Sequence, residues 1–159
     1  IVIAGSSTVN PALLESGRPD ELVDLAVALH TFPTGPIKLI LDLVFGHCDN
    51  QALAALNHHF FAGPNMYGQD LSFRHPAVRA TLLELQRRKV NFGADGIRVD
   101  GAQDVKVWDA EQQLLVHDDD YLQEMSDILQ EVCGVSYLPF CIFEDGRPWP
   151  SPDWELAST

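Results

Sequence analysis

The sequence is poor in basic residues: 10 Lys and Arg stand against 23 Asp and Glu, for a net charge of -13. Nucleic acids and anionic membranes are bound through clusters of Lys and Arg, so neither is expected as a partner. No apolar run is long enough to span a membrane. The three cysteines are odd in number and lack metal-ligand spacing. They favour a reduced, cytoplasmic setting and indicate no metal centre.

What is present suits one folded domain. The chain has 159 residues, of which 46% are apolar and 21% charged, as is ordinary for a globular protein. We interpret residues 1–159 as a single catalytic domain. The opening segment, residues 1–4, is too short for a signal peptide. Both ends have the character of interior sequence, so we expect a domain truncated at both ends.

Strand and helix patterns alternate along the chain. Strands are predicted at residues 1–4, 37–45, 96–100 and 138–144, and helices at residues 19–30, 50–61, 76–89 and 118–132. Residues 62–73 are predicted as loop. The strand at 37–45 is apolar almost throughout, which is typical of a parallel strand buried on both faces. Such alternation favours βαβ units, whose functional groups gather at the C-terminal ends of the strands.

Three carboxylates fall at or near such strand ends: Asp42, Asp100 and Glu144. Arg98 shares a strand face with Asp100, and burying this pair is costly unless the charges serve a purpose. A structural ion pair is the plain alternative, but the other two carboxylates favour a functional site. Glycoside cleavage requires two carboxyl groups in different protonation states. Because the positive charge of Arg98 favours an ionised Asp100, we expect Asp100 as nucleophile and Glu144 as proton donor.

Exposed aromatic rings can bind the flat faces of sugars. Tyr67, Trp108 and Trp149 are candidates for this role. For Trp108, packing in the core is the favoured interpretation.

Four short motifs occur in order along the chain. They are Asp42-Leu43-Val44-Phe45-Gly46-His47, Gln69-Asp70-Leu71-Ser72, Gly96-Ile97-Arg98-Val99-Asp100 and Phe143-Glu144. Together they resemble the α-amylase family of glycoside hydrolases (family 13). The first, third and fourth resemble that family's first, second and third conserved regions. The second resembles the stretch that precedes the family's third helix.

The resemblance implies a partial (β/α)8 barrel with about four parallel strands and a retaining glycosidase acting on α-glucosidic bonds. By position, Asp100 is then the nucleophile, Glu144 the acid/base and Arg98 the residue that orients Asp100. His47 would hold the sugar in the cleavage subsite, with Asp42 as a supporting carboxylate. The expected substrate-binding set is His47, Asp42, Tyr67 and Gln103. The expected ligand is an α-glucoside or oligosaccharide.

The motifs also depart from the family's pattern. Gly46 stands where the family commonly has an Asn that helps to bind calcium, so neither a calcium site nor a cofactor is expected. Gln103 and Asp104 replace a Lys-His pair found in many starch-cleaving amylases. This change leaves room for a phosphorylase or transglycosylase. The family's fourth region, with a third catalytic Asp, would lie beyond Thr159. We therefore expect the 159 residues alone to be inactive and to self-associate through open barrel edges.

Two further interpretations of the carboxylates stay open. In a metal-dependent, enolase-type barrel, Asp42, Asp100 and Glu144 would hold Mg²⁺. Arg98 argues against this, because a cation beside a metal site is unfavourable. In the other interpretation, the chain binds carbohydrate without cleaving it.

Overall fold

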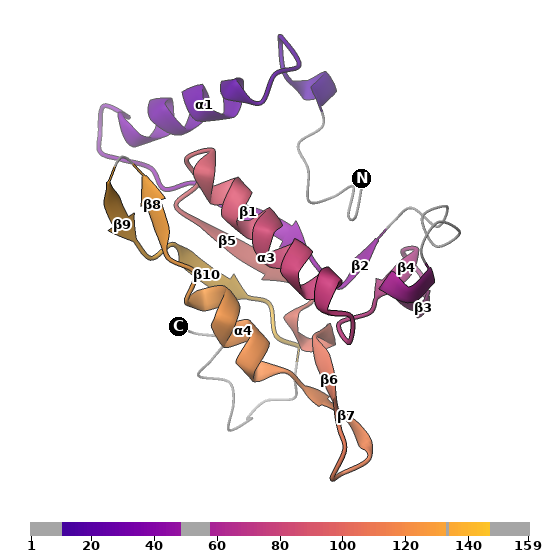
Figure 1. Ribbon diagram of the computed structural model, residues 1–159. Helices are drawn as coiled ribbons and strands as arrows, with labels where there is room; N and C mark the ends of the chain where they lie inside the picture. The colour runs from indigo at the N-terminus through magenta and orange to yellow at the C-terminus, as the bar shows by residue number, and fades with distance from the viewer. Residues whose placement is uncertain (1–10, 49–57, 133, 147–159) are drawn as a thin grey trace.

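The computed structural model describes residues 11–48, 58–132 and 134–146 of the chain (Figure 1). Its centre is a parallel sheet of three strands in the order β1-β5-β10, so β5 is the middle strand. The bounds are Ile40–Val44 for β1, Gly96–Asp100 for β5 and Phe140–Phe143 for β10. In register, Asp42 pairs with Arg98, and Arg98 pairs with Ile142 on the other side.

Three α-helices are described: α1 (Asp20–His30), α3 (Pro76–Asn91) and α4 (Asp119–Ser126). The start of α3 is marked by Pro76 at its first position and by the His75 side chain, which accepts a hydrogen bond from Ala77 N at 3.2 Å. The Asp118 carboxylate caps α4 by accepting from Tyr121 N at 3.0 Å. Among the described helices, none has the length and apolar character that crossing a membrane requires.

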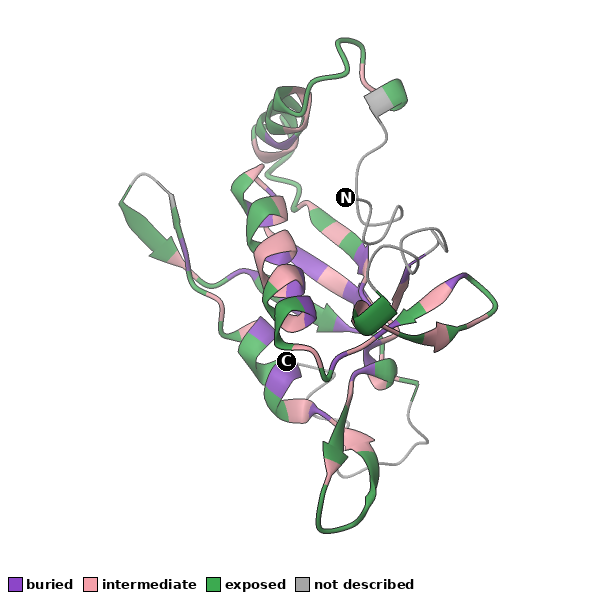
Figure 2. Ribbon diagram, turned by 45° about the vertical axis from the view of Figure 1, so that its right-hand side comes forward, coloured by how far each residue is buried: buried purple, intermediate pink, exposed green. Residues whose placement is uncertain are grey.

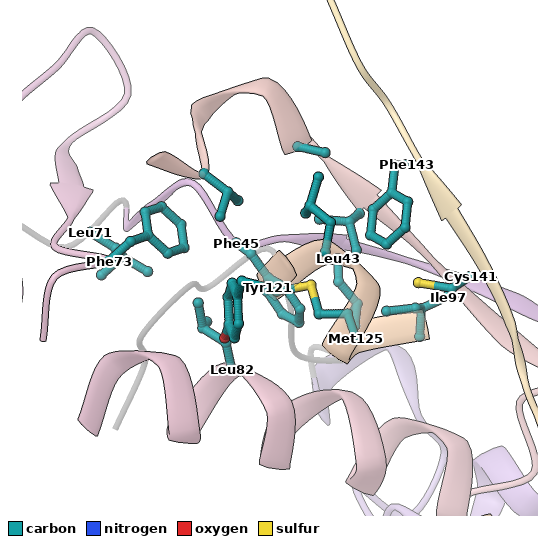
Figure 3. Packing of buried hydrophobic residues seen from close by; sticks show 14 of the residues in the cluster. Leu43, Phe45, Leu71, Phe73, Leu82, Ile97, Tyr121, Met125, Cys141 and Phe143 are labelled. Carbon is teal, nitrogen blue, oxygen red and sulfur yellow. The ribbon is translucent and has the colours of Figure 1, made fainter. Parts of the chain in front are cut away.

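Helices α3 and α4 cover one face of the parallel sheet (Figure 1). Leu82 of α3, Tyr121 and Met125 of α4 and Ile97 of β5 belong there to one buried cluster (Figure 3). Val99 of β5 is a member of the same cluster. Leu82, Ile97 and Tyr121 are fully buried. Each such side chain contributes about 1.5–3 kcal/mol through removal from water, which makes this layer the main source of stability.

The opposite face of the sheet is left uncovered by the described helices (Figure 2). Because side chains alternate along a strand, burying Ile97 and Val99 places Arg98 and Asp100 on this open face. Gly96 lets β10 approach closely, since a Cβ at this position would lie 2.6 Å from the Phe140 Cβ. The open face therefore combines charged residues with exposed apolar ones.

Three small antiparallel sheets flank this centre. They are the sheet β2-β4-β3 and the hairpins β6-β7 and β8-β9. Their strands are β2 (His47–Cys48), β3 (Phe61–Pro64), β4 (Gln69–Leu71), β6 (Lys106–Asp109), β7 (Leu114–His117), β8 (Gln130–Val132) and β9 (Val135–Tyr137). Short 3-10 turns occur at η2 (Pro11–Leu13), η3 (His58–Phe60) and η4 (Ala102–Asp104).

The partial (β/α)8 barrel expected from the sequence is wrong. The described residues form a small α/β domain in which three parallel strands lie beside several antiparallel pairs, and no barrel is evident. A barrel needs strand following helix repeatedly around a closed ring. Here the chain leaves β5 into the β6-β7 hairpin and leaves α4 into the β8-β9 hairpin, so the βα alternation is interrupted twice.

Several predicted elements agree with the structure and others do not. The helices at 19–30 and 76–89 correspond to α1 and α3, and the strand at 96–100 is β5. The predicted helix at 118–132 ends at Ser126 instead, because its last residues pair as β8 with β9 around Gly134, whose φ is +77°. The predicted loop at 62–73 contains most of β3 and all of β4. The predicted strand at 1–4 and most of the helix at 50–61 lie outside the described residues.

Helix α1 is attached at one end of the sheet, away from the strand termini that carry Asp100 and Glu144 (Figure 1). His30 Nε2 lies 2.6 Å from Asp95 Oδ2, and Lys38 Nζ lies 2.7 Å from Asp95 Oδ1. Leu39 N donates to the same carboxylate at 2.8 Å. Burial alone would raise the pKa of Asp95, but the hydrogen bonds from Lys38, His30 and Leu39 together lower it. An ionised Asp95 therefore ties α1 and the entry to β1 to the middle strand.

Candidate functional site

One guanidinium joins three carboxylates at the open face of the parallel sheet. Arg98 Nη1 lies 2.9 Å from both carboxylate oxygens of Asp42 and 2.7 Å from Asp100 Oδ1. Arg98 Nη2 lies 2.9 Å from Glu144 Oε1. The register of the sheet explains the arrangement. Asp42 is paired with Arg98, Asp100 is two residues further on the same face, and Glu144 follows β10 directly.

The cluster of carboxylates changes the ionisation of Arg98. The hydrogen bond to Asp42 is the largest effect and raises the pKa of the guanidinium; burial opposes it, and Asp100 and Glu144 add to the rise. Arg98 therefore stays positively charged throughout the range in which proteins are folded. A permanent cation lies between the two residues that the sequence assigns to catalysis.

Glu144 is held by the backbone as well as by Arg98. Its Oε2 accepts a hydrogen bond from Gly101 N at 3.1 Å, and its own carbonyl accepts from Ala102 N at 2.9 Å. Gly101 has a φ of +66°, the left-handed conformation that glycine adopts without strain. This turn directly after β5 brings the backbone N–H back toward Glu144.

Asp100 and Glu144 open onto a cleft of about 940 Å³. The size suits a small ligand, since such sites measure about 300–1,000 Å³. The cleft lies between the strand ends of the parallel sheet, the β2-β4-β3 sheet and the β6-β7 hairpin. Its polar lining residues include His47, Asn65, Asp70, Ser72, Arg74, Asp100, Gln103, Asp104, Lys106 and Glu144.

His47 and Tyr67 form one wall of the cleft. Their rings stack with centroids 4.8 Å apart and planes inclined by 20°. Tyr67 is 62% exposed, so its ring remains accessible to a ligand. Asn65 fixes the loop that carries Tyr67, because its side-chain oxygen accepts hydrogen bonds from Tyr67 N and Gly68 N, both at 2.7 Å. Asn65 also donates to Asp70 of β4.

Gln103 also lines the cleft. Its Oε1 accepts a hydrogen bond from Gly146 N at 3.1 Å, which links η4 to the segment that follows Glu144. This contact fixes the orientation of the amide, and its Nε2 can donate to a hydroxyl in the cleft.

The structure brings the predicted site residues together in two groups. Asp100, Glu144, His47, Tyr67 and Gln103 line the cleft. Asp42 and Arg98 are not among the lining residues and join the site through their ion pairs. The roles assigned to these residues stay predictions.

The aromatic residues are placed differently from expectation. Trp108 was expected in the core, but it is 47% exposed on β6, because the hairpin projects from the sheet. The Arg74 guanidinium lies over its ring, 5.3 Å from the centroid. Trp149 lies outside the described residues. The motifs do not point to Arg74 or Lys106. The one available signal was their rarity as cations in an acidic chain.

The metal-dependent alternative requires Asp42, Asp100 and Glu144 to converge on a divalent cation. In the structure they converge on the Arg98 guanidinium. Within the described ranges, no group of three or more His, Cys, Asp or Glu side chains has an arrangement that could hold a metal ion. The geometry of these three carboxylates therefore does not favour the enolase-type interpretation.

Comparison with known proteins gives one family. Residues 1–159 match the family described as "Hypothetical glycoside hydrolase 5". No curated protein matches the sequence. The match agrees with the coarser part of the resemblance, a glycoside hydrolase, and does not identify the α-amylase family.

Proposed function

Because this chain belongs to the hypothetical glycoside hydrolase 5 family, we propose that its residues serve the cleavage of α-glucosidic bonds by a retaining, α-amylase-type mechanism. The observation that carries the proposal is the position of Asp100 and Glu144. They end neighbouring parallel strands, contact the same guanidinium and line the same cleft.

In the first step, a carboxylate oxygen of Asp100 attacks the anomeric carbon while the bond to the leaving-group oxygen breaks. Glu144 donates its proton to that oxygen, so the leaving group departs as a neutral alcohol. In the second step, Glu144 takes a proton from water, and the water oxygen replaces Asp100 at the anomeric carbon. Retaining enzymes place the two carboxyl groups about 5–5.5 Å apart, and we expect this separation when the sugar is bound.

Arg98 acts on both steps without touching the sugar. It fixes the direction of the Asp100 carboxylate by its hydrogen bond. The same guanidinium contacts Glu144, whose second oxygen accepts from Gly101 N. The acid role therefore requires the incoming glycosidic oxygen to displace one of these two contacts.

The remaining cleft residues bind the sugar in this proposal. The exposed ring of Tyr67, backed by His47, offers a flat apolar surface to a sugar face. Gln103, which also lines the cleft, donates a hydrogen bond from its Nε2 to a sugar hydroxyl. If a sugar hydroxyl or phosphate replaces water in the second step, the same residues perform transglycosylation or phosphorolysis.

Trapping the glycosyl-enzyme tests the proposal. The intact protein is incubated with an activated 2-fluoro α-glucoside and examined by mass spectrometry, and we expect one label on Asp100. Asp100→Asn should remain unlabelled, because an amide is a poor nucleophile. Asp24→Asn, an exposed position on α1, is the matched control and should be labelled like the wild type. A label on any other carboxylate would remove Asp100 from the role of nucleophile.

Carbohydrate binding without cleavage is the second candidate function. It is favoured by the observation that Arg98 and Gly101 N already occupy both carboxylate oxygens of Glu144. In that case glycosides would bind to the protein, and neither labelling nor turnover would occur.

A further inference from the structure

Most cations of this acidic chain are neutralised by a carboxylate. In the described ranges, the Lys and Arg side chains with an Asp or Glu within 4.0 Å are Arg18, Lys38, Arg79, Arg87, Arg88 and Arg98. The described side chains without such a carboxylate are Arg74, Lys89 and Lys106. Acidic residues outnumber basic ones more than twofold, so unpaired cations call for an explanation.

Two of these three cations line the same cleft. Arg74, in the segment between β4 and α3, and Lys106, on β6, are both lining residues. Lys89 lies near the C-terminal end of α3 and is not among them. The unpaired charge is therefore concentrated where a ligand would bind.

Arg74 and Lys106 both lie at the β6-β7 hairpin, Lys106 on β6 itself and Arg74 over the Trp108 ring. Lys106 and Trp108 are two residues apart on β6 and so share a face of the hairpin. The Arg74 guanidinium lies 5.3 Å from the centre of the Trp108 ring. Leu115, which also lines the cleft, is the cross-strand partner of Trp108. The hairpin thus presents a cation and an aromatic ring, and Arg74 from the segment before α3 adds a second cation over that ring.

The rest of the cleft has the opposite charge. Asp70, Asp100, Asp104 and Glu144 all line it. Arg98 forms ion pairs with only two of these four carboxylates, Asp100 and Glu144. An anion is repelled near these carboxylates and attracted at the hairpin wall. The cleft therefore carries charges of both signs, and Arg74 and Lys106 are the positive charges in its lining that no carboxylate neutralises.

We propose that the ligand of this cleft is an anionic glycoside, with a carboxylate or sulfate group on the sugar that contacts Arg74 and Lys106. This inference rests on the proposed function and names its substrate class. The planar fork of Arg74 matches the oxygens of either group, and Lys106 adds a second charged donor. Stacking on Trp108 holds Arg74 in place before the ligand arrives.

Calorimetric titration of the intact protein with matched pairs of oligosaccharides tests the proposal. One pair is an α-1,4-linked oligoglucuronide and its methyl ester, which keeps the rings and removes the charge. The other is a sulfated maltooligosaccharide and the same oligosaccharide without sulfate. We expect the charged member of one pair to bind about tenfold more tightly than its neutral partner, as one charge-assisted contact allows. Which pair shows the preference distinguishes a carboxylate from a sulfate.

Variants assign the preference to the hairpin wall. The double variant Arg74→Gln/Lys106→Gln should bind the charged and neutral members equally, whereas Lys89→Gln, which removes the other unpaired cation, should keep the preference. If the wild type binds both members of each pair equally, the inference is overturned and the proposed function still stands. The same holds if Lys89→Gln abolishes the preference as fully as the double variant does. If neither these probes nor neutral α-glucosides bind, the proposed function fails together with the inference.

Discussion

Asp42 and Arg98 occupy paired positions on neighbouring parallel strands, and their side chains meet with Nη1 2.9 Å from both carboxylate oxygens. The contact connects β1 to the two carboxylates that face the cleft. Asp42 does not line the cleft itself. We therefore expect Asp42 to act on the cleft as a positioning residue, through its contact with Arg98.

We expect Arg98→Gln to lower kcat/KM on a fluorogenic α-glucoside by on the order of 10²-fold, because Asp100 loses the hydrogen bond that directs it. Asp42→Asn should cause a smaller loss, since Arg98 keeps Asp100 and Glu144. Arg98→Lys keeps the positive charge but loses the planar guanidinium that contacts several carboxylates at once. Its loss of kcat/KM should lie between those of Arg98→Gln and Asp42→Asn. Circular dichroism checks that each variant is folded. Equal activity in wild type and Arg98→Gln would make the cluster a structural ion pair only.

Glu144→Gln should separate substrates by their leaving groups. On a natural disaccharide, we expect a loss of about 10²–10⁴-fold in kcat, since no proton reaches the departing oxygen. On an activated aryl α-glucoside, whose leaving group needs little protonation, the first step should be nearly unaffected. Steady-state rates on the two substrates give the ratio. Equal losses on both would take the acid role away from Glu144.

Asp95 should make stability depend on pH in the acid range. Its pKa is lowered below the ordinary value of 3.8, despite burial, by hydrogen bonds from Lys38 and His30. A carboxyl whose pKa is lower in the folded state stabilises the fold above the unfolded-state pKa. That stabilisation is lost as the pH falls through the lowered value. Urea unfolding midpoints between about pH 5 and about pH 3 should thus fall less steeply in Asp95→Asn than in wild type.

Asp24→Asn, on the exposed side of α1, is the control for this experiment. It should follow the wild-type midpoints over the same pH range. Parallel curves for wild type and Asp95→Asn would show that the contacts of Asp95 with His30 and Lys38 do not contribute to stability.

We propose that the 159-residue chain self-associates by docking a second copy onto the uncovered sheet. In the described part of the chain, β1 and β10 are the outer strands, and edge strands present unpaired N–H and C=O groups. Ile40, Phe140 and Ile142 add exposed apolar surface on the same face. Sedimentation velocity should show species that grow with concentration.

Ile40→Lys should shift this equilibrium toward the monomer, because a charged side chain on an edge strand opposes pairing. Val27→Lys, at a similarly exposed apolar position on α1, is the matched control and should leave the association unchanged. A wild-type chain that sediments as a monomer at every concentration would contradict the proposal.

The local sequence pattern predicted an element correctly where the packing of the folded chain favours the same secondary structure as the local sequence does. Ile97 and Val99 alternate with Arg98 and Asp100, and β5 has the predicted bounds. The segment after Ser126 behaves differently, because its apolar residues suit a helix or a strand equally well. The positive φ of Gly134 allows a tight turn, and the antiparallel pairing of β8 with β9 makes this segment a hairpin. That pairing, together with the β6-β7 hairpin, is what a helix-strand alternation could not anticipate.

The candidate site shows the same division. The carboxylates at strand ends were predicted because parallel strands bring their C-terminal ends together. The contact of Arg98 with all three depends on the register between strands far apart in sequence, which no local pattern contains. The position of Arg74 over Trp108 depends in the same way on how the β6-β7 hairpin packs beside the β4-α3 segment.

The alternation along β5 has one more consequence. A shift of β5 by a single residue would turn Arg98 and Asp100 toward α3 and α4 and expose Ile97 and Val99 to water. Such a slip would bury two charges and open the core in one step, so the misaligned state is penalised twice. Burial of the apolar face of β5 therefore fixes the register that places Arg98 and Asp100 on the open face. A substitution at Ile97 or Val99 can disable the site by allowing misalignment, without touching a residue of the cleft.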